Sequence, residues 1–162
     1  RRLFGHPVVA AVGEQLPIAD RSVDAAWSLG VLCTASDKAA MVAELRRVVR
    51  PAAQIGLLVY VQMATDLPEQ PEGNHFPEPD ELDALIAGAG LQIVDRARIA
   101  DFPPAPDSWR DAVQAVDGLI ARDHASDQRW LTARDQQESI GRLIADDLVV
   151  GHLIVATLPR RS

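Results

Sequence analysis

Two apolar runs separated by one amphipathic helix constrain the fold of this chain more than any other feature. Val23 to Leu32 and Ile55 to Val61 are mostly apolar and as long as strands, which is typical of strands buried on both faces of a parallel sheet. Between them, Asp37 is a candidate N-cap, and Pro51 is a residue at which a helix stops. The apolar face of this helix consists of Met41, Leu45, Val48 and Val49. Strand, helix and strand in this order predict a right-handed βαβ unit with a parallel strand pair.

Further elements are expected on either side of this unit. Val8 to Val12 is a short β-branched run, either an edge strand or an extended lead-in to the next loop. A Pro-rich connection follows Val61, and a helix is expected from Glu81 to Ala89, with Gly90 as its C-cap. Strands are expected from Gln92 to Ile99 and from Leu148 to Leu158. Two amphipathic helices fill the interval between these strands, and we expect their tryptophans, Trp109 and Trp130, to anchor the packing of the pair.

The segment from Val8 to Pro51 also carries a family pattern. It contains LPIADRSVD at 16–24, leading into a strand, and ELRRVVRP at 44–51, closing a helix. This combination resembles class I S-adenosylmethionine-dependent methyltransferases of the small-molecule type (methyltransferase type 11-like). The resemblance implies a Rossmann-like α/β fold whose seven strands have the spatial order 3-2-1-4-5-7-6. This chain would supply strands 4-5-7-6, a partial doubly wound sheet with a helical insertion before the last strand.

The same resemblance implies a domain organisation. Residues 1–162 would form a single methyltransferase-like domain that corresponds to the C-terminal portion of the family fold. The helices within 103–147 would be an insertion, which in similar proteins often caps the acceptor pocket. The chain begins on two arginines without an initiator methionine, and we therefore expect a fragment, a proteolytic product or an incompletely described chain.

By the same resemblance, the cofactor is S-adenosylmethionine, and two groups of residues would lie against it. Residues 11–18 align with the family's G-D-A-E-x-L-P-F loop at the adenine edge. Val12 replaces the acidic residue that usually accepts a hydrogen bond from the adenine amino group, so that contact would be lost. Gly13 would still offer a backbone N–H to the ring, and Glu14 follows it in the loop. The residues beneath the methionine part would be Ser28, Leu29 and Gly30.

Three departures from the family pattern affect this expectation. The glycine-rich turn that brings backbone N–H groups to the cofactor carboxylate has no counterpart here, and neither has the acidic residue that holds the ribose hydroxyls. We therefore expect the chain alone to bind S-adenosylmethionine weakly and to be inactive or incomplete as an enzyme. In addition, the family's R-P-G-G appears as Arg50-Pro51-Ala52-Ala53, which should weaken that turn.

His75, in the Pro-rich connection, is the candidate catalytic residue. Similar enzymes place acceptor-binding residues in this loop, and an imidazole can deprotonate a substrate hydroxyl near neutral pH; the alternative is a loop histidine that bonds only to local backbone. Cys33 is interpreted as a small buried apolar residue. Asp20 and Asp24 are interpreted as turn residues. The remaining charged group, interpreted as a solvated helix face, consists of Arg46, Arg47 and Arg50.

Composition excludes several classes of function. The net charge of −7 over 162 residues argues against a nucleic-acid groove. No apolar run approaches the roughly 20 residues of a membrane span, and no cluster of cysteines and histidines has metal-ligand spacing. The single cysteine cannot form an internal disulfide, which favours a reducing cytoplasm.

Three functional hypotheses remain. The first is a methyltransferase that acts on a small-molecule acceptor by direct in-line transfer. The second is a non-catalytic, self-associating module derived from that family, which forms a homodimer through the Val23 to Leu32 strand, because a strand left at a sheet edge invites pairing. The third is a fragment of another doubly wound protein such as a reductase, which the ELRRVVRP helix followed directly by a strand disfavours.

Overall fold

A computed structural model describes residues 2–3 and 5–159 of the chain. Its centre is a four-stranded sheet with the order β3-β4-β6-β5. The strands are β3 (Val23–Leu29), β4 (Val49–Gln62), β5 (Gln92–Arg98) and β6 (Val149–Thr157). β3 pairs in parallel with β4, whereas β6 runs antiparallel to both β4 and β5. This order corresponds to the expected 4-5-7-6 arrangement, so the predicted partial Rossmann-like sheet is confirmed.

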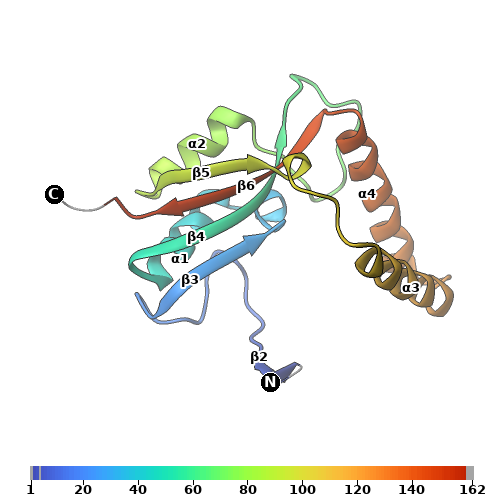
Figure 1. Cartoon of the computed structure of the whole chain (residues 1–162), viewed down its shortest axis with the longest axis horizontal. Coiled ribbons are helices and arrows are strands. Elements are labelled where there is room, and N and C mark those ends of the chain that lie inside the picture. Colours follow the sequence, from blue (N-terminus) through green and yellow to red (C-terminus); the bar gives the residue numbers. More distant parts are fainter. Residues whose placement is uncertain (1, 4, 160–162) are drawn as a thin grey trace.

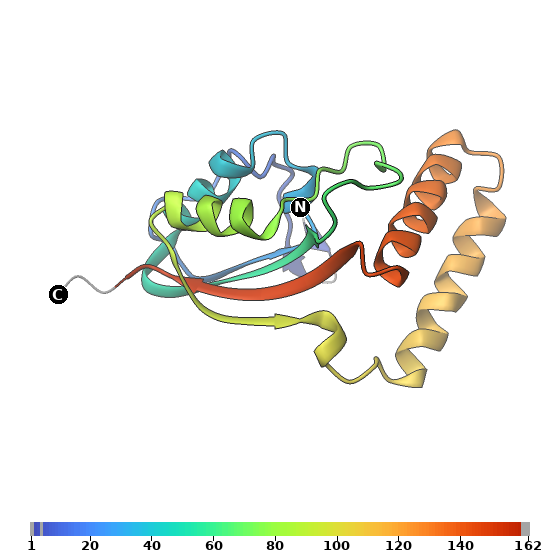
Figure 2. The same cartoon turned by 90° about the horizontal axis from the view of Figure 1, so that it is seen from above.

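Two helices cover one face of the sheet. These are α1 (Lys38–Val48) and α2 (Pro79–Gly88), and Figure 2 shows both on the same side. The core lies beneath them, because alternate residues of β4 from Ala53 to Val61 are buried together with the apolar face of α1. Asp37 caps α1 as predicted, since its carboxylate accepts the Ala40 N–H at 2.8 Å.

The opposite face of the sheet is less covered. Trp27 on β3 is 68% exposed, and Leu29 and Val94 are also exposed. The Trp27 ring lies across Gly56 of β4, where an added Cβ would come within 3.3 Å of the ring. Glycine at this position therefore allows the tryptophan to lie flat on the neighbouring strand. A sheet that contains a parallel pair normally has both faces buried, so this face is a surface with unused apolar area.

Several element boundaries differ from those predicted. β3 ends at Leu29 rather than Leu32, because Gly30 has φ 72 and turns the chain into the short 3-10 helix η1 (Leu32–Thr34). Helix α1 ends at Val48, before Pro51, and β4 begins at the next residue. Pro51 therefore lies inside a strand, where the pairing of β3 with β4 shifts register. Val8 to Val12 forms no regular strand, which leaves the extended lead-in as the correct alternative.

The remaining elements lie outside the four-stranded sheet (Figure 1). Short strands β1 (Arg2–Leu3) and β2 (His6–Pro7) pair near the N-terminus, and the 3-10 helix η2 (Ile99–Asp101) follows β5. Helices α3 (Asp107–Asp123) and α4 (Gln128–Ala145) form a hairpin that projects from the end of the sheet (Figure 1). Trp109 on α3 is 65% exposed, so the prediction that it anchors the helix pair is wrong.

Candidate functional site

The parallel strands β3 and β4 end side by side, and the candidate site lies at this edge. After β3, the Gly30 N–H donates to the Leu58 carbonyl at 2.9 Å, and its positive φ turns the chain across the end of β4. Such a conformation suits glycine, which has no Cβ to clash. Leu29, just before the turn, is exposed. The edge therefore presents Leu29 and Gly30 on a fixed backbone, as expected for residues that would lie beneath a ligand.

Ser28 differs from its two neighbours because its side chain points into the core. It pairs with Leu57, which is buried under the helices, and Ser28 itself is only 5% exposed. Its hydroxyl has no hydrogen-bond partner among the described residues. Of the three residues predicted at the methionine side, Leu29 and Gly30 therefore border the open edge. Ser28 can take part only through its backbone.

The Pro-rich connection lies over the same edge. The His75 N–H donates to the Cys33 carbonyl at 2.8 Å, so this loop is fixed directly to the segment that follows β3. The His75 residue is exposed, which leaves its imidazole open to solvent. Cys33 is 1% exposed, and its thiol donates to the Tyr60 carbonyl at 3.2 Å. Burial raises the pKa of the Cys33 thiol, so it is a buried neutral thiol, in agreement with the sequence interpretation.

Helix α4 holds the other end of this connection. The Arg142 guanidinium donates two hydrogen bonds to the Glu69 carboxylate, at 3.1 and 3.0 Å. These bonds lower the pKa of Glu69. In addition, the Gln136 amide donates to the Glu72 carbonyl at 3.0 Å. The Pro-rich connection is thus fastened to η1 on one side and to α4 on the other, which places α4 beside the candidate site.

The adenine-side residues are held against the start of α1. The Val12 carbonyl accepts the Gln15 N–H at 3.1 Å in a tight turn, and the Val12 side chain is exposed. Gly13 approaches α1 so closely that an added Cβ would lie 3.1 Å from the Met41 sulfur. The Glu14 carboxylate accepts hydrogen bonds from the Ser36 hydroxyl and the Asp37 N–H. Bonds from backbone N–H groups, first its own and then that of Asp37, lower the pKa of Glu14, which keeps it ionised.

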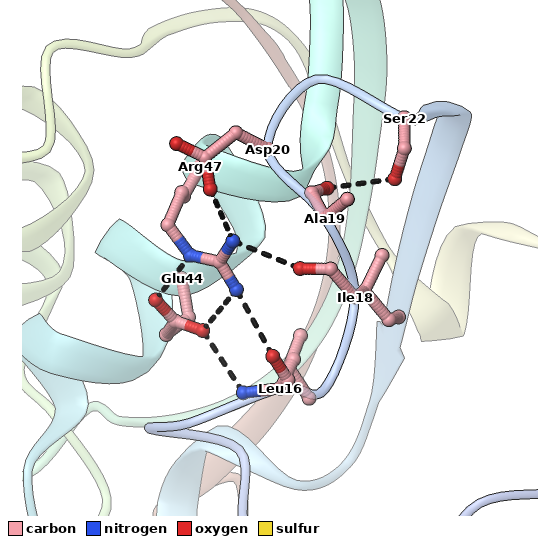
Figure 3. A network of polar contacts seen from close by, with 7 residues as sticks. All are labelled: Leu16, Ile18, Ala19, Asp20, Ser22, Glu44 and Arg47. Atoms are coloured by element: carbon pink, nitrogen blue, oxygen red, sulfur yellow. Dashed lines mark hydrogen bonds and ion pairs between the residues drawn. The ribbon is translucent and has the colours of Figure 1, made fainter.

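Residues 16–20 are fastened to α1 by a network that we call the Arg47 clasp, formed by Glu44 and Arg47 with Leu16, Ile18 and Asp20 (Figure 3). The Arg47 guanidinium donates to the Glu44 carboxylate at 2.7 and 2.8 Å and to Asp20 at 2.5 Å. It also donates to the carbonyls of Ile18 and Leu16, at 2.8 and 3.0 Å. These are five bonds for the five N–H donors of an arginine. Glu44 in turn accepts the Leu16 N–H at 2.9 Å.

The clasp shifts the ionisation of both charged partners. Hydrogen bonds from Arg47, followed by the bond from the Leu16 N–H, lower the pKa of Glu44 to about 2. The same carboxylate, and then that of Asp20, raise the pKa of Arg47. The interpretation of Arg47 as part of a solvated helix face was therefore wrong. The sequence gives no sign of this role, because two of the acceptors are main-chain carbonyls.

Asp20 lies in a turn, as interpreted, whereas Asp24 lies in β3 and not in a turn. Asp20 accepts from Arg47 of α1, and Asp24 pairs with Arg50 of β4. Both partners are exposed in the second pair, so it contributes little to stability. The loop before β3 is thus attached to both ends of α1, by Glu14 at the N-terminus of the helix and by Asp20, which bonds to Arg47 near its C-terminus.

Comparisons with known proteins show what this chain resembles. Residues 1–57 match the family model described as a methyltransferase domain. No curated protein matches the chain by sequence. The fold is that of class I S-adenosylmethionine-dependent methyltransferases, and the resemblance drawn from the sequence is confirmed.

Three solved structures illustrate this likeness. The [4+2]-cyclase SpnF has a TM-score of 0.67 at 19% identity, and the alignment covers 94% of this chain and 56% of that one. An O-methyltransferase segment of StiE has a TM-score of 0.62 at 14% identity, and the alignment covers 93% of this chain and 48% of that one. The third is a phosphoethanolamine N-methyltransferase 2 from Haemonchus contortus, in complex with phosphomonomethylethanolamine and S-adenosylhomocysteine. It has a TM-score of 0.61 at 12% identity, and the alignment covers 91% of this chain and 36% of that one. This chain thus spans between a third and three fifths of their lengths.

Across residues 2–3 and 5–159, no three or more His, Cys, Asp or Glu side chains are grouped so that they could hold a metal ion. Within the same part of the chain, no helix combines the length and the apolar content that crossing a membrane requires.

Proposed function

We propose that this chain is the acceptor-side portion of a domain that transfers a methyl group from S-adenosylmethionine to a small-molecule acceptor. The observation that carries the proposal is the meeting of three segments at the ends of β3 and β4: the Gly30 turn, the loop with His75, and the Val12–Glu14 turn at the start of α1. The match to the methyltransferase domain over residues 1–57 supports it. The same match favours it over the reductase alternative.

In this proposal, S-adenosylmethionine supplies an electrophilic methyl group when it is bound. The backbone of Gly13 and the exposed edge at Leu29 and Gly30 would hold its two ends. The acceptor atom forms a bond to the methyl carbon while the sulfur–carbon bond breaks, and the products are the methylated acceptor and S-adenosylhomocysteine. The exposed His75 imidazole would take the proton that the acceptor loses. The contribution of this chain is mainly orientation.

The domain assignment and the compartment belong to the same proposal. Residues 1–162 would form one methyltransferase-like unit in which 103–147 caps the acceptor side, because α4 is bonded to the loop that contains His75. The free, buried thiol of Cys33 favours a reducing compartment such as the cytoplasm. The low polarity of the edge at Leu29 favours a small organic acceptor over a nucleic acid.

Chemical-shift mapping tests the two halves of the cofactor separately. Adenosine added to the ¹⁵N-labelled chain should shift the amides of Gly13 and Glu14, whereas S-adenosylhomocysteine should in addition shift those of Leu29 and Gly30. We expect weak binding of both, because Val12 supplies no acceptor for the adenine amino group. Shifts elsewhere, or no shifts at millimolar ligand, would contradict the proposal. Where methyl transfer is measurable, His75→Gln should lower kcat without changing the shifts that S-adenosylhomocysteine induces.

A second candidate function is a self-associating module without catalysis, formed as a homodimer through the β3 region. The observation that favours it is the edge position of β3 together with the exposure of Trp27 and Leu29 on its open face. The fold alone does not fix the reaction, since one structure that shares it is described as a [4+2]-cyclase. Trp27→Ser should abolish a dimer of this kind. A dimer that persists in this variant would exclude the β3 contact.

A further inference from the structure

The hairpin at the end of the sheet contains a helix that packs on almost nothing. Helix α3 has 17 residues, none of them buried. Its neighbour α4 buries Ser139 and Leu143. An isolated helix of about this length is marginal in water even when it is rich in alanine, and α3 also contains Gly118. A stable α3 therefore requires a covering surface.

The exposed side chains of α3 form a regular seam, which consists of Trp109, Val113, Val116 and Ile120. They recur at intervals of four, three and four residues, which is the spacing of the two core positions of a coiled coil. Their exposed fractions are 65%, 43%, 52% and 36%. Leu119, next to Ile120, is 51% exposed and widens the apolar surface on one side. The pattern is that of a helix whose partner is another helix.

We propose that this partner is the α3 helix of a second copy of the same chain, in antiparallel orientation. In that orientation the seam matches itself, because Trp109 lies opposite Ile120 of the second copy and Val113 lies opposite Val116. Each layer then combines a larger residue with a smaller one, or two valines. A parallel pair would instead place the two Trp109 rings on each other.

The charges beside the seam select the same orientation. Arg110 and Asp117 occupy equivalent positions one residue after Trp109 and Val116, on one flank of the seam. When two such helices run antiparallel, Arg110 of each copy faces Asp117 of the other, which gives two ion pairs of opposite charge. The other flank has Ala112 and Leu119, which are apolar. Within its own helix Arg110 pairs only with Asp107, and both are largely exposed, so this bond is weak and easily replaced.

Helix length limits the strength of the contact. A 17-residue helix is about 25 Å long at 1.5 Å per residue, and two of them bury less than the roughly 1,200 Å² of a standard stable interface. We therefore expect a reversible dimer with a dissociation constant in the micromolar range. The proposal does not depend on methyl transfer, and the contact is separate from the β3 region.

The proposal is tested by exchanging the charges at Arg110 and Asp117. Sedimentation equilibrium of the 162-residue chain at micromolar concentrations then measures the affinity of the dimer. Arg110→Asp alone and Asp117→Arg alone should each weaken the dimer about tenfold or more, because each places like charges opposite one another. The double variant with both exchanges should restore the affinity of the native chain to within about threefold, since the pairs re-form with reversed sign. Both positions are on an exposed helix, and circular dichroism of each of the three variants checks that α3 is retained.

The other possible outcomes argue against an antiparallel contact between two α3 helices. A monomer at every concentration would overturn the proposal, as would a dimer whose affinity is the same in both single variants. A dimer that is lost in Trp27→Ser but unaffected by the charge exchanges would move the contact to β3. Failure of the double variant to recover, with both singles weakened, would exclude the antiparallel pairing.

Discussion

Helices α1 and α3 have similar amphipathic sequences but opposite environments. Helix α1 buries Met41, Val42, Leu45 and Val48 against the sheet, and its polar side is bound to the preceding loop by Glu44 and Arg47. Helix α3 buries no residue, and its two arginines, Arg110 and Arg122, pair with aspartates of the same helix. An apolar stripe thus shows that a helix needs a partner, but not that the same chain provides it.

The largest expected difference between the two helices lies in the cost of removing one leucine side chain. Leu45→Ala in α1 should lower the free energy of unfolding by about 2 to 5 kcal/mol, because it leaves a cavity in the core. Leu119→Ala in α3 should change it by about 0.5 kcal/mol or less, because Leu119 is already half exposed. Urea unfolding at a concentration where the chain is monomeric measures both. Equal losses would mean that α3 is packed within the monomer.

The next largest effect concerns the Arg47 clasp. Arg47→Met keeps the aliphatic stem but removes all five hydrogen-bond donors, so the urea midpoint should fall clearly. The amide of Leu16, which donates to Glu44, should exchange with solvent faster, because Glu44 loses the partner that orients it. Arg122→Met in α3 is the matched control and should change neither quantity, since among the described residues Arg122 pairs only with its neighbour Asp123. Unchanged Leu16 exchange in Arg47→Met would show that the loop is held by other contacts.

The same clasp predicts a dependence on pH. Glu44 has a folded-state pKa of about 2, below its ordinary value of 4.5. A carboxylate whose pKa is depressed by folding contributes stability above its unfolded pKa and loses it as the pH falls through the folded value. The difference in stability between the native chain and Glu44→Gln should therefore be constant from pH 5 to 7 and shrink between about pH 4.5 and 2. A difference that grows on acidification would have the wrong sign.

The smallest predicted effects come from two exchanges of alanine and glycine. Ala52, near the start of β4, has φ 66, a conformation that disfavours residues with a Cβ. Ala52→Gly should therefore stabilise the fold by about 0.5 to 1 kcal/mol. This value is the backbone strain that glycine relieves minus the conformational entropy that glycine loses on folding. Gly118→Ala should stabilise helix α3 by a similar free energy and so raise its helicity. A glycine in a helix interior is unfavourable, and an added Cβ at this position meets nothing within 4 Å. Thermal unfolding and circular dichroism measure the two effects. Destabilisation by Ala52→Gly would show that the positive φ carries no strain.

These contrasts also mark the limits of what the sequence could predict. Helix α1 was predicted because it had two local signals, the Asp37 cap and the periodic apolar face, and the strand at Val23 to Leu32 because it is mostly apolar. The sheet order was implied by the resemblance of residues 16–24 and 44–51 to the methyltransferase family. The start of β4 was missed because Pro51 was read as a stop for the helix, although the helix ends three residues earlier. The weakness expected at Ala52 agrees with its positive φ.

The candidate site was less accessible to sequence reasoning. The contact between His75 and Cys33 joins two loops through backbone atoms, which no residue pattern encodes. The direction of Ser28 depends on register, since a shift by one residue would bring its side chain to the other face. The periodicity of α3 identified its apolar side, but whether anything covers that side is a property of the tertiary structure.

The Arg47 clasp determines which of its positions can accept another amino acid. The acceptors at Leu16 and Ile18 are main-chain carbonyls, which every amino acid supplies, so these two positions can exchange side chains without loss of the bonds. Arg47 has no such freedom, since lysine has three N–H donors where five are in use. Positions 16 and 18 in the loop therefore tolerate substitution, whereas position 47 in the helix that holds the loop does not.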